Sequence, residues 1–391
     1  MTDHVTQAYL DDERLHGVMG RLDLPPHLAA AYGDRLVDRP YFLEEYTAHR
    51  VAADVMDLFE LLFSLPVRLF GGSFARYADA LGLPPERTAL MGADRPPMHG
   101  RADFHRVGGD VRLLGLDAGS RLAGVHLGGL SRAVHEHPEM QPFVAEHELA
   151  CYDPVGKLLD VIGRDRTIAF VGVERLDGIR EACARDGVDV LVGGPHELTD
   201  RDGYLYLDGS RLDVVVRYFS AEQAAGVVDT LVRGHKTELY TSLSSCWYGG
   251  GATLALVADR RDELPEDARA LVDRLLPWTR AVRDVPRDRL REDREGLVVK
   301  ASAGGDVHQG WLLTDREWVA VLDEVADGPY VVQERVRPTP DVVPGDDRPW
   351  LTTWGWFVTD QGFAGMALRA RPVADGVVVG GRSRVSGLLL Y

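Results

Sequence analysis

The sequence contains few cysteines and no surplus of positive charge. Only three cysteines occur among 391 residues, at positions far apart, which excludes a disulfide scaffold and a zinc cluster of the usual spacing. Lysine and arginine total 44 against 61 aspartate and glutamate, giving a formal net charge of -17. An acidic balance of this size argues against non-specific binding to nucleic acid or to anionic membranes, because both require a basic face.

Long apolar segments are also missing. No apolar run approaches the roughly 18 residues that a transmembrane helix needs. The N-terminus, Met1-Thr-Asp-His-Val5, has neither the basic nor the apolar segment of a secretion signal. A chain of 391 residues with 45% hydrophobic content is long enough for two or three domains with a substantial core. We therefore expect a cytoplasmic, globular protein that does not contact a membrane.

The first half of the chain divides into three predicted regions. Residues 1–98 form a helical N-terminal region, because apolar residues recur at helical spacing through 41–63. Residues 99–165 begin with a hairpin, whose strands cover 101–107 and 111–117 around the turn Gly108-Gly-Asp110. Residues 166–235 predict a Rossmann-like layer: its segments are strand 167–173, a helix through Cys183, strand 188–192, and a further hairpin that pairs 204–207 with 212–217.

Residues 236–391 form the fourth predicted region. A helix is expected over 262–282, and the dense alternation of charge in 283–294 indicates a solvated helix or linker. Beyond residue 296 the pattern is mostly that of strands, interrupted by a Pro- and Asp-rich loop at 338–349. The strands expected near the C-terminus cover 354–359, 363–369 and 376–380.

The early hairpin carries a cluster of charged residues. Side chains two positions apart share one face of a strand, so Arg101 and Asp103 point the same way and the end of the second strand brings Asp117 nearby. Two carboxylates beside an arginine suit magnesium bound to a polyphosphate, because the hard cation takes oxygen ligands and the guanidinium holds phosphate. The alternative is an ion pair between Arg101 and Asp103 on an exposed hairpin.

A lysine at the end of a later strand suggests a nucleotide site. Lys300 closes the apolar run 296–300 and is followed by a flexible stretch that contains Ser302, Gly304 and Gly305. Glycines let the backbone approach an anion, and the ammonium supplies the charge that a phosphate needs. The next strand pattern, 330–336, carries a polar pair at its end. The alternative is an ordinary hairpin with a lysine on its surface.

In order and spacing, these segments resemble the circularly permuted ATP-grasp proteins related to the ligase domain of glutathionylspermidine synthetase. In that family an Arg-x-Asp motif is followed, twelve residues after its Asp, by Glu-x-Asn. Here Arg101 and Asp103 match, Gly115 replaces the glutamate, and Asp117 replaces the asparagine. A second departure is Gly251, which stands where the family has a nucleotide-binding lysine.

The resemblance implies an α/β fold with α+β lobes: a permuted ATP-grasp architecture with a Rossmann-like layer and a helical N-terminal region. It implies that Asp103 and Asp117 hold Mg²⁺, and that Arg101 and Arg369 stabilise the transferring phosphoryl group. The residues implied to contact ATP are Lys300 with the covering loop residues Ser302, Gly304 and Gly305, and the adenine and ribose contacts Gln333 and Glu334. Arg217 ends its strand where it could meet an anion, or pair with Asp213 instead.

The activity that this resemblance implies is ATP-dependent ligation of a carboxylate to an amine through an acyl phosphate. The cofactors would be ATP and Mg²⁺, and the substrates a small-molecule or peptide acid and amine. Because Gly115 and Gly251 remove two expected charges, a catalytically degenerate nucleotide-binding or scaffold protein is the alternative. A third hypothesis is a histidine metalloenzyme built on His135, His137 and His147. The oligomeric state is left open.

Overall fold

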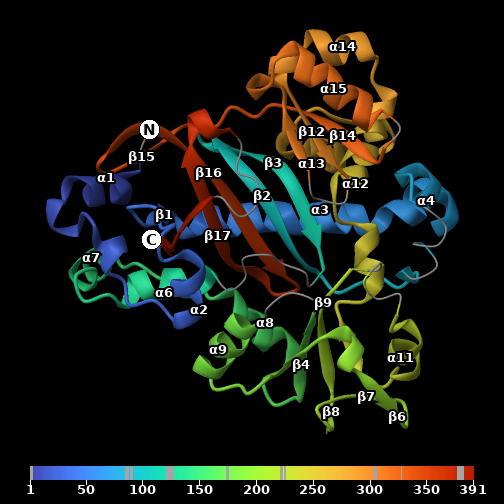
Figure 1. Ribbon diagram of the computed structural model, residues 1–391, viewed down its shortest axis with the longest axis horizontal. Coiled ribbons are helices and arrows are strands. Elements are labelled where there is room, and N and C mark those ends of the chain that lie inside the picture. Colours follow the sequence, from blue (N-terminus) through green and yellow to red (C-terminus); the bar gives the residue numbers. More distant parts are fainter. Residues whose placement is uncertain are drawn as a thin grey trace.

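The computed structural model describes residues 3–83, 88, 91–119, 127–172, 176–220, 223, 226–302, 306–326, 328–376 and 383–391. The chain forms a mixed α/β structure. A long antiparallel sheet occupies the centre, with a smaller parallel sheet and a smaller antiparallel sheet on its flanks (Figure 1).

The central sheet joins the early hairpin to the C-terminal part of the chain. Its strands, in spatial order, are β18 (Arg384–Ser386), β17 (Gly362–Pro372), β16 (Asp346–Thr359), β2 (His99–Val107) and β3 (Asp110–Ala118), with β15 (Asp341–Val343) paired to β16. The predicted hairpin is confirmed as β2 and β3, and the strands predicted at 354–359 and 363–369 are confirmed within β16 and β17. Strand β16 pairs with β2, with Trp354 opposite Phe104, so the C-terminal strands and the early hairpin form one sheet.

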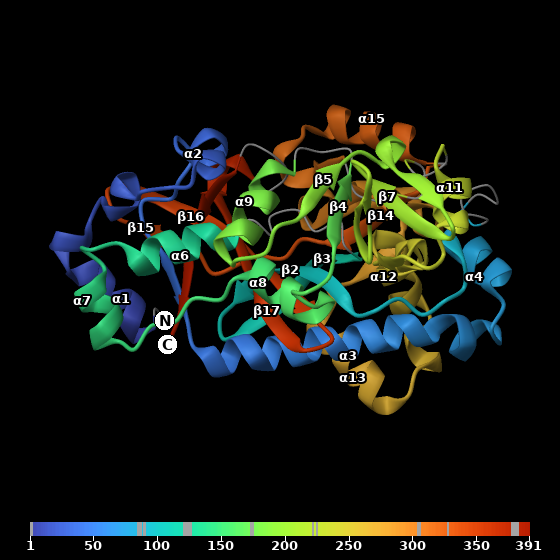
Figure 2. The ribbon, with the colours of Figure 1, turned by 90° about the horizontal axis from the view of Figure 1, so that it is seen from below.

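One long helix covers one face of this sheet. Helix α3 (Glu45–Phe70) buries Val51, Val55, Phe59 and Leu62, which recur every three or four residues along one side. It ends at Gly71, whose left-handed backbone (φ 61°) closes the last turn. Figure 2 shows α3 running along the sheet, with α13 (Glu266–Leu275) beside it. The opposite face of the sheet is therefore left for Arg101 and Asp103 of β2.

The N-terminal region is helical for the most part, as predicted, with one exception. Besides α3, it forms the helices α1 (His4–Asp11), α2 (Pro26–Tyr32) and α4 (Phe74–Leu81). The prediction is wrong at Tyr41–Leu43, which is strand β1 and pairs in parallel with β19 (Leu388–Leu390). All three side chains of β1 are buried, and a short apolar run of this kind takes its structure from its partner.

A four-stranded parallel sheet forms the Rossmann-like layer. Its order is β10 (Glu238–Tyr240), β9 (Val214–Tyr218), β4 (Ile168–Gly172) and β5 (Leu191–Gly193), flanked by α8 (Pro154–Ile162) and α9 (Asp177–Arg185). The predicted β-α-β unit is confirmed, since β4, α9 and β5 follow one another and the two strands are parallel.

The hairpin predicted between 204–207 and 212–217 is wrong. Strand β7 (Tyr204–Leu207) pairs instead with β6 (Thr199–Arg201) and β8 (Ser210–Arg211), whereas β9 joins the parallel sheet. The five residues of β9 are all buried, which is typical of a strand covered on both faces and not of an alternating hairpin strand.

A second antiparallel sheet carries the lysine strand. Its order is β11 (Thr279–Ala281), β14 (Tyr330–Glu334), β12 (Leu297–Ala301) and β13 (Val307–Gln309), and it lies with α14 (Arg287–Glu292) and α15 (Asp315–Val325) at the upper right of Figure 1. The helix predicted over 262–282 is correct only for α13 (Glu266–Leu275): Pro277 disfavours helical backbone in the residue before it, and 279–281 form β11 instead. The predicted loop 338–349 in fact contains β15 and the start of β16, and most of 376–380 lies outside the described residues.

The remaining helices are short. They are α6 (Gly128–Glu136), α7 (Gln141–Glu146), α11 (Val228–Arg233) and α12 (Gly251–Asp259). No single helix of the described residues is long and apolar enough to cross a membrane; α3 and α4 satisfy that criterion only together, and they meet at a bend of 109°.

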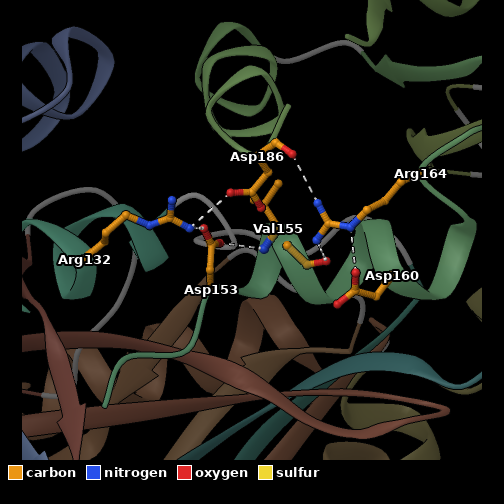
Figure 3. Close-up of polar contacts among 7 residues, drawn as sticks. Arg132, Asp153, Val155, Asp160, Arg164 and Asp186 are labelled. Carbon is orange, nitrogen blue, oxygen red and sulfur yellow. Dashed lines mark hydrogen bonds and ion pairs between the residues drawn. The ribbon is translucent and has the colours of Figure 1, made fainter. Parts of the chain in front are cut away.

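A network of arginines and aspartates ties α6, α8 and α9 together (Figure 3). Arg132 of α6 donates to Asp153 and, at 3.2 Å, to Asp186 after α9. Asp153 also caps α8, because its Oδ1 accepts from the Val155 N–H at 2.9 Å. Arg164 donates to the Asp186 carbonyl at 3.3 Å. Asp153 is thus a cap and an ion-pair partner at once, with a side chain only 18% exposed.

Replacing Asp153 with alanine is expected to lower the free energy of unfolding by about 2–3 kcal/mol, because it removes a helix cap and leaves Arg132 with one partner fewer. Urea denaturation would measure it. Asp160→Ala is the matched control, since Asp160 is 42% exposed and forms a surface ion pair with Arg164, just beyond the end of α8. Its loss should be roughly 0.5 kcal/mol or less. Equal losses in the two variants would contradict the role assigned to Asp153.

Candidate functional site

The central charges lie on one face of the β2–β3 hairpin. Register places Arg101 opposite Asp117 and Asp103 opposite Gly115. The Arg101 guanidinium donates to both oxygens of Asp103, at 2.8 and 2.9 Å, and to Oδ2 of Asp117 at 2.9 Å. The predicted cluster therefore forms, and so does the ion pair that was its alternative. The pair is not on an exposed hairpin, however, because the Arg101 side chain is only 5% exposed.

Arg369 adds a second guanidinium from β17, where it lies opposite Thr353 of β16. Its Nη2 is 3.6 Å from Oδ2 of Asp103 and makes no hydrogen bond to any described residue. Burial lowers the pKa of Arg369 from its ordinary value, and the neighbouring Arg101 adds to this. Arg369 is thus a half-buried cation with an unused N–H donor beside the carboxylates.

The carboxylate of Asp103 is held in its ionised form. Burial alone would raise its pKa, but Arg101, Arg369 and Lys300 together outweigh burial and lower the pKa below its ordinary value. Burial would likewise lower the pKa of Arg101, and Asp103 and Asp117 reverse that effect. Arg101 and Asp103 thus stabilise each other's charge, so removal of either one leaves the other unbalanced.

Lys300 reaches the hairpin from the second antiparallel sheet. Its Nζ donates to the main-chain carbonyl of Leu114 in β3 and, at 2.7 Å, to Oε1 of Gln333. Burial lowers the pKa of Lys300 to about 8, and the nearby Asp103 opposes the shift. The alternative of a surface lysine is wrong, since the ammonium is part-buried between two sheets. Segments nearly two hundred residues apart thus meet at one site.

Both the oxygen and the nitrogen of the Gln333 side-chain amide form hydrogen bonds at this junction. While Oε1 accepts from Lys300, Nε2 donates to the Leu113 carbonyl at 3.4 Å and to Thr279 Oγ1 at 3.1 Å. The side chain is 2% exposed, and its hydrogen bond to Leu113 joins the two sheets. Glu334 is exposed, and its N–H donates to the Trp278 carbonyl at 2.8 Å. Adenine and ribose contacts by these two residues remain predictions.

The loop after Lys300 is described only in part. Ser302 belongs to the junction with α12, because its N–H donates to the Pro329 carbonyl and its carbonyl accepts from the Gly251 N–H, both at 2.7 Å. Gly304 and Gly305 lie outside the described residues. The predicted covering role of this loop therefore stays a prediction.

Arg217 lies at the end of β9, 2% exposed, and supports a neighbouring loop. Its guanidinium donates to the Thr241 carbonyl at 2.8 Å and to Ser245 Oγ at 2.7 Å. The alternative pairing with Asp213 is wrong, because Asp213 accepts from the Thr167 N–H at 2.9 Å and lies 3.7 Å from Arg211. The side chain nevertheless ends beside the candidate site. A Cβ built on Gly119, two residues after Asp117, would lie 3.0 Å from Arg217 Nη2.

The two glycines that replace family charges differ in their surroundings. A Cβ built on Gly115 would meet no atom within 4 Å, so the site has open room where the family carries a glutamate. A Cβ on Gly251 would lie 2.6 Å from Val331 Cγ2, and the Gly251 N–H is bonded to Ser302. A side chain could therefore be restored at 115 without rearrangement, but not at 251.

Two histidines of this face were missed by the sequence analysis. His105 continues the alternation of Arg101 and Asp103 along β2, is 0% exposed, and shares a 3.3 Å hydrogen bond with Thr353 Oγ1. His99 precedes them on the same face, is 4% exposed, and packs edge-on against Tyr240. Burial lowers the pKa of His105 to about 4 and that of His99 to about 3. The two-residue spacing was the signal that could have identified both.

The histidine metal site is not supported. The ring of His135 contacts the Leu149 carbonyl at 3.1 Å, and the ring of His137 contacts the Arg21 carbonyl at 3.2 Å. No group of three or more His, Cys, Asp or Glu side chains placed to hold a metal ion occurs in the described part of the chain. His135 ends helix α6 and does not lie on a strand, so the expected shared face does not form.

Of the comparisons with known proteins, only the one with solved structures bears on the fold. No family model and no curated protein matches the chain. Among solved structures, it is similar to a glutathione synthetase-like effector (GSS30) from Globodera pallida in its apo form, with 11% identity and a TM-score of 0.56. The match covers 91% of this chain and 90% of the other. A likeness at this identity supports an ATP-grasp-type fold and nothing finer; the circular permutation stays a prediction.

Proposed function

We propose that this protein is an ATP-dependent ligase that joins a carboxylate to an amine through an acyl phosphate. The observation that carries the proposal is the meeting of three cations, Arg101, Arg369 and Lys300, with two carboxylates at one site. The site draws on two separate sheets of an ATP-grasp-type fold. Phosphoryl transfer needs this kind of arrangement, because its catalysis is mostly positioning and charge stabilisation.

Two of the cations have donors to offer an anion. An ammonium has three N–H bonds, and Lys300 uses two of them in hydrogen bonds to described residues, to Leu114 and Gln333. The Nη2 of Arg369 makes no hydrogen bond to any described residue. In the proposed reaction Lys300 binds ATP phosphate, while Arg101 and Arg369 stabilise the charge that develops on the transferring group.

Asp103 and Asp117 fit a magnesium site by their chemistry. Both are carboxylates, and Mg²⁺ prefers oxygen ligands and retains several waters. The open room beside Gly115 leaves space for such waters. Mg²⁺ bound there would neutralise phosphate charge during transfer. The chain itself would orient the carboxylates through Arg101, which already contacts both.

The proposed reaction has two steps. A substrate carboxylate oxygen takes the γ-phosphoryl group of ATP, and ADP leaves. The amine nitrogen then attacks the acyl carbon, the C–N bond forms, phosphate leaves, and the amine gives up a proton. No nucleophilic side chain is required, which agrees with the composition of the site. The acid and the amine are small molecules or peptides, and in this proposal the ligase acts in the biosynthesis of a peptide or a specialised metabolite.

The second candidate is a protein that binds a nucleotide without turnover. It is favoured by Arg101, whose contacts occupy both oxygens of Asp103, and by the close packing at Gly251. ATP binding that is unchanged in Asp103→Asn, with no turnover for any acceptor, would favour this candidate over the ligase.

ATP binding measured by calorimetry tests the proposal, and Lys300→Met is the informative variant. We expect its Kd to rise about 10- to 100-fold, because a charge-assisted hydrogen bond contributes about 1.5–3 kcal/mol. In the unaltered protein the affinity should also fall as pH rises above 8, since the Lys300 ammonium, whose pKa is about 8, then loses its proton.

Lys157→Met is the matched control for this experiment, because Lys157 lies on α8 and contacts the Tyr152 ring. It should keep both the affinity and its pH dependence, while Lys300→Met should lose the pH dependence. Absence of ATP binding with and without magnesium would exclude both candidate functions.

A further inference from the structure

A pocket lies away from the candidate ligase site. Its walls come from α1, the segment before β1, the end of β2, β15 and β16. The lining residues used in the argument below are Asp3, Arg39, Arg106, Asp341, Thr352 and Trp354. In Figure 1 these elements gather at the upper left, near the N-terminus, whereas the lysine sheet lies at the upper right.

The pocket is on the opposite face of the central sheet from Arg101. Arg106 is five residues from Arg101 along β2, so its side chain points to the other face and lies about 17 Å along the strand. Its guanidinium stacks 5.1 Å from the centre of the Trp354 ring, and Trp354 is the register partner of Phe104 on that same face. The two sites are therefore separate.

Two guanidinium groups line the pocket without a carboxylate partner. Arg39 is 4% exposed, and its hydrogen bonds go to the main-chain carbonyls of Pro40 and Val342, at 3.2 and 3.0 Å. The Arg106 guanidinium makes no hydrogen bond and no ion pair within 4.0 Å to any residue that the structure describes. A buried or half-buried guanidinium is normally paired, so both are placed to bind an outside anion.

Two carboxylates share the same pocket, again without an ion pair. Burial raises the pKa of Asp341, although Arg39, Thr352 and Arg106 act in the other direction. Asp3 caps α1 and accepts from the Thr6 N–H and hydroxyl, both at 2.8 Å. Across the described residues, neither carboxylate comes within 4.0 Å of a cationic nitrogen.

The pocket is preformed. The segment that carries Asp341 is tied to the end of β2, because the Thr339 N–H donates to the Arg106 carbonyl and the Gly108 N–H donates to Thr339 Oγ1, both at 2.9 Å. Its other walls include the apolar side chains of Leu10 and Phe42. A rigid, partly apolar cavity with a few fixed charges is typical of a small-molecule site.

We propose that this pocket binds a small zwitterion that carries one carboxylate and one ammonium group, an α-amino acid with an apolar side chain. A simple anion would satisfy Arg39 and Arg106 but would leave Asp341 facing a like charge. A simple cation would leave the arginines unsatisfied. A ligand with both charges pairs its carboxylate with the arginines and its ammonium with Asp341, while its side chain contacts Trp354.

Calorimetric titration with L-leucine tests this site, with N-acetyl-L-leucine and L-leucinamide as analogues that each lack one charge. Leucine should bind at one site per chain, and each analogue should bind at least about tenfold more weakly, because each leaves a charge unpaired. Arg106→Gln and Asp341→Asn should weaken leucine binding to a similar extent. Both variants keep the size of the side chain, and circular dichroism would verify that they fold.

The result is separable from the ligase proposal. Lys300→Met should keep leucine binding, and Arg106→Gln should keep ATP binding. Three outcomes would overturn the zwitterion site. The first is no leucine binding, and the second is equal binding of N-acetyl-L-leucine or sodium acetate, which would indicate an anion site only. The third is leucine binding that is lost in Arg369→Met but kept in Arg106→Gln, which would place the ligand in the ligase site.

Discussion

Replacing Asp103 with asparagine is expected to lower magnesium-dependent ATP turnover by about a thousandfold, since a lost transition-state contact of this kind typically costs 10²–10³. Asp103 accepts two hydrogen bonds from Arg101 and lies 3.6 Å from Arg369. Its charge also raises the pKa of Lys300 against the effect of burial. One substitution therefore removes a proposed metal ligand and the charge that balances three cations.

The same substitution should reduce stability, because Arg101 is 5% exposed and would lose its ion pair with Asp103 while it keeps the one with Asp117. Removing one partner of a buried ion pair costs about 3–5 kcal/mol, so turnover must be measured where the variant is still folded. ADP release under saturating magnesium gives the rate, and urea denaturation gives the stability.

Asp110→Asn is the control for Asp103→Asn, because it makes the same chemical change at an exposed position of the same hairpin. It should keep both turnover and stability. If Asp103→Asn loses stability but retains the turnover of the unaltered protein, the carboxylate is structural and the ligase proposal loses its metal site.

The hairpin at the centre of the site could be predicted because its signals are local. The alternation of Arg101, Asp103 and their apolar neighbours has the period of a strand, and Gly108-Gly109 supplies the turn. Lys300 was likewise identified from the apolar run that it ends. The two segments meet through the Lys300–Leu114 hydrogen bond.

The features that were not predicted from the sequence depend on contacts between residues far apart in the chain. Tyr41–Leu43 carries a helical spacing but becomes a strand, because β19 lies beside it. Strand β9 was assigned to a hairpin because 204–207 precedes it, although β4 and β10 are its neighbours. The hydrogen bonds of Gln333 Nε2 to Leu113 and Thr279 also depend on tertiary contacts, since both residues are distant from Gln333 in the chain. Local patterns do not contain this information.

Acidification from pH 7 to pH 5 is expected to lower the free energy of unfolding by about 4 kcal/mol through His99 and His105 alone. Burial lowers their pKa values in the folded chain, to about 3 and about 4, from the ordinary value of 6.5. Stability is therefore complete above pH 6.5 and falls as pH drops towards 4, because the unfolded chain binds protons that the folded chain does not. Each histidine contributes about 1.4 kcal/mol per pH unit in this window.

His99 is the clearer of the two, because neither ring nitrogen has a hydrogen-bond partner among the described residues and its pKa is lowered by burial alone. His99→Leu should therefore halve the loss between pH 7 and pH 5, to about 2 kcal/mol. At pH 7 it should cost little, since the His99 ring has no hydrogen-bond partner among the described residues to lose. His49→Leu, at a ring that is 49% exposed, is the control and should keep the full loss. An unchanged pH dependence in His99→Leu would mean that the His99 ring gains a proton without unfolding, and that water or a rearranged neighbour reaches this face of the sheet.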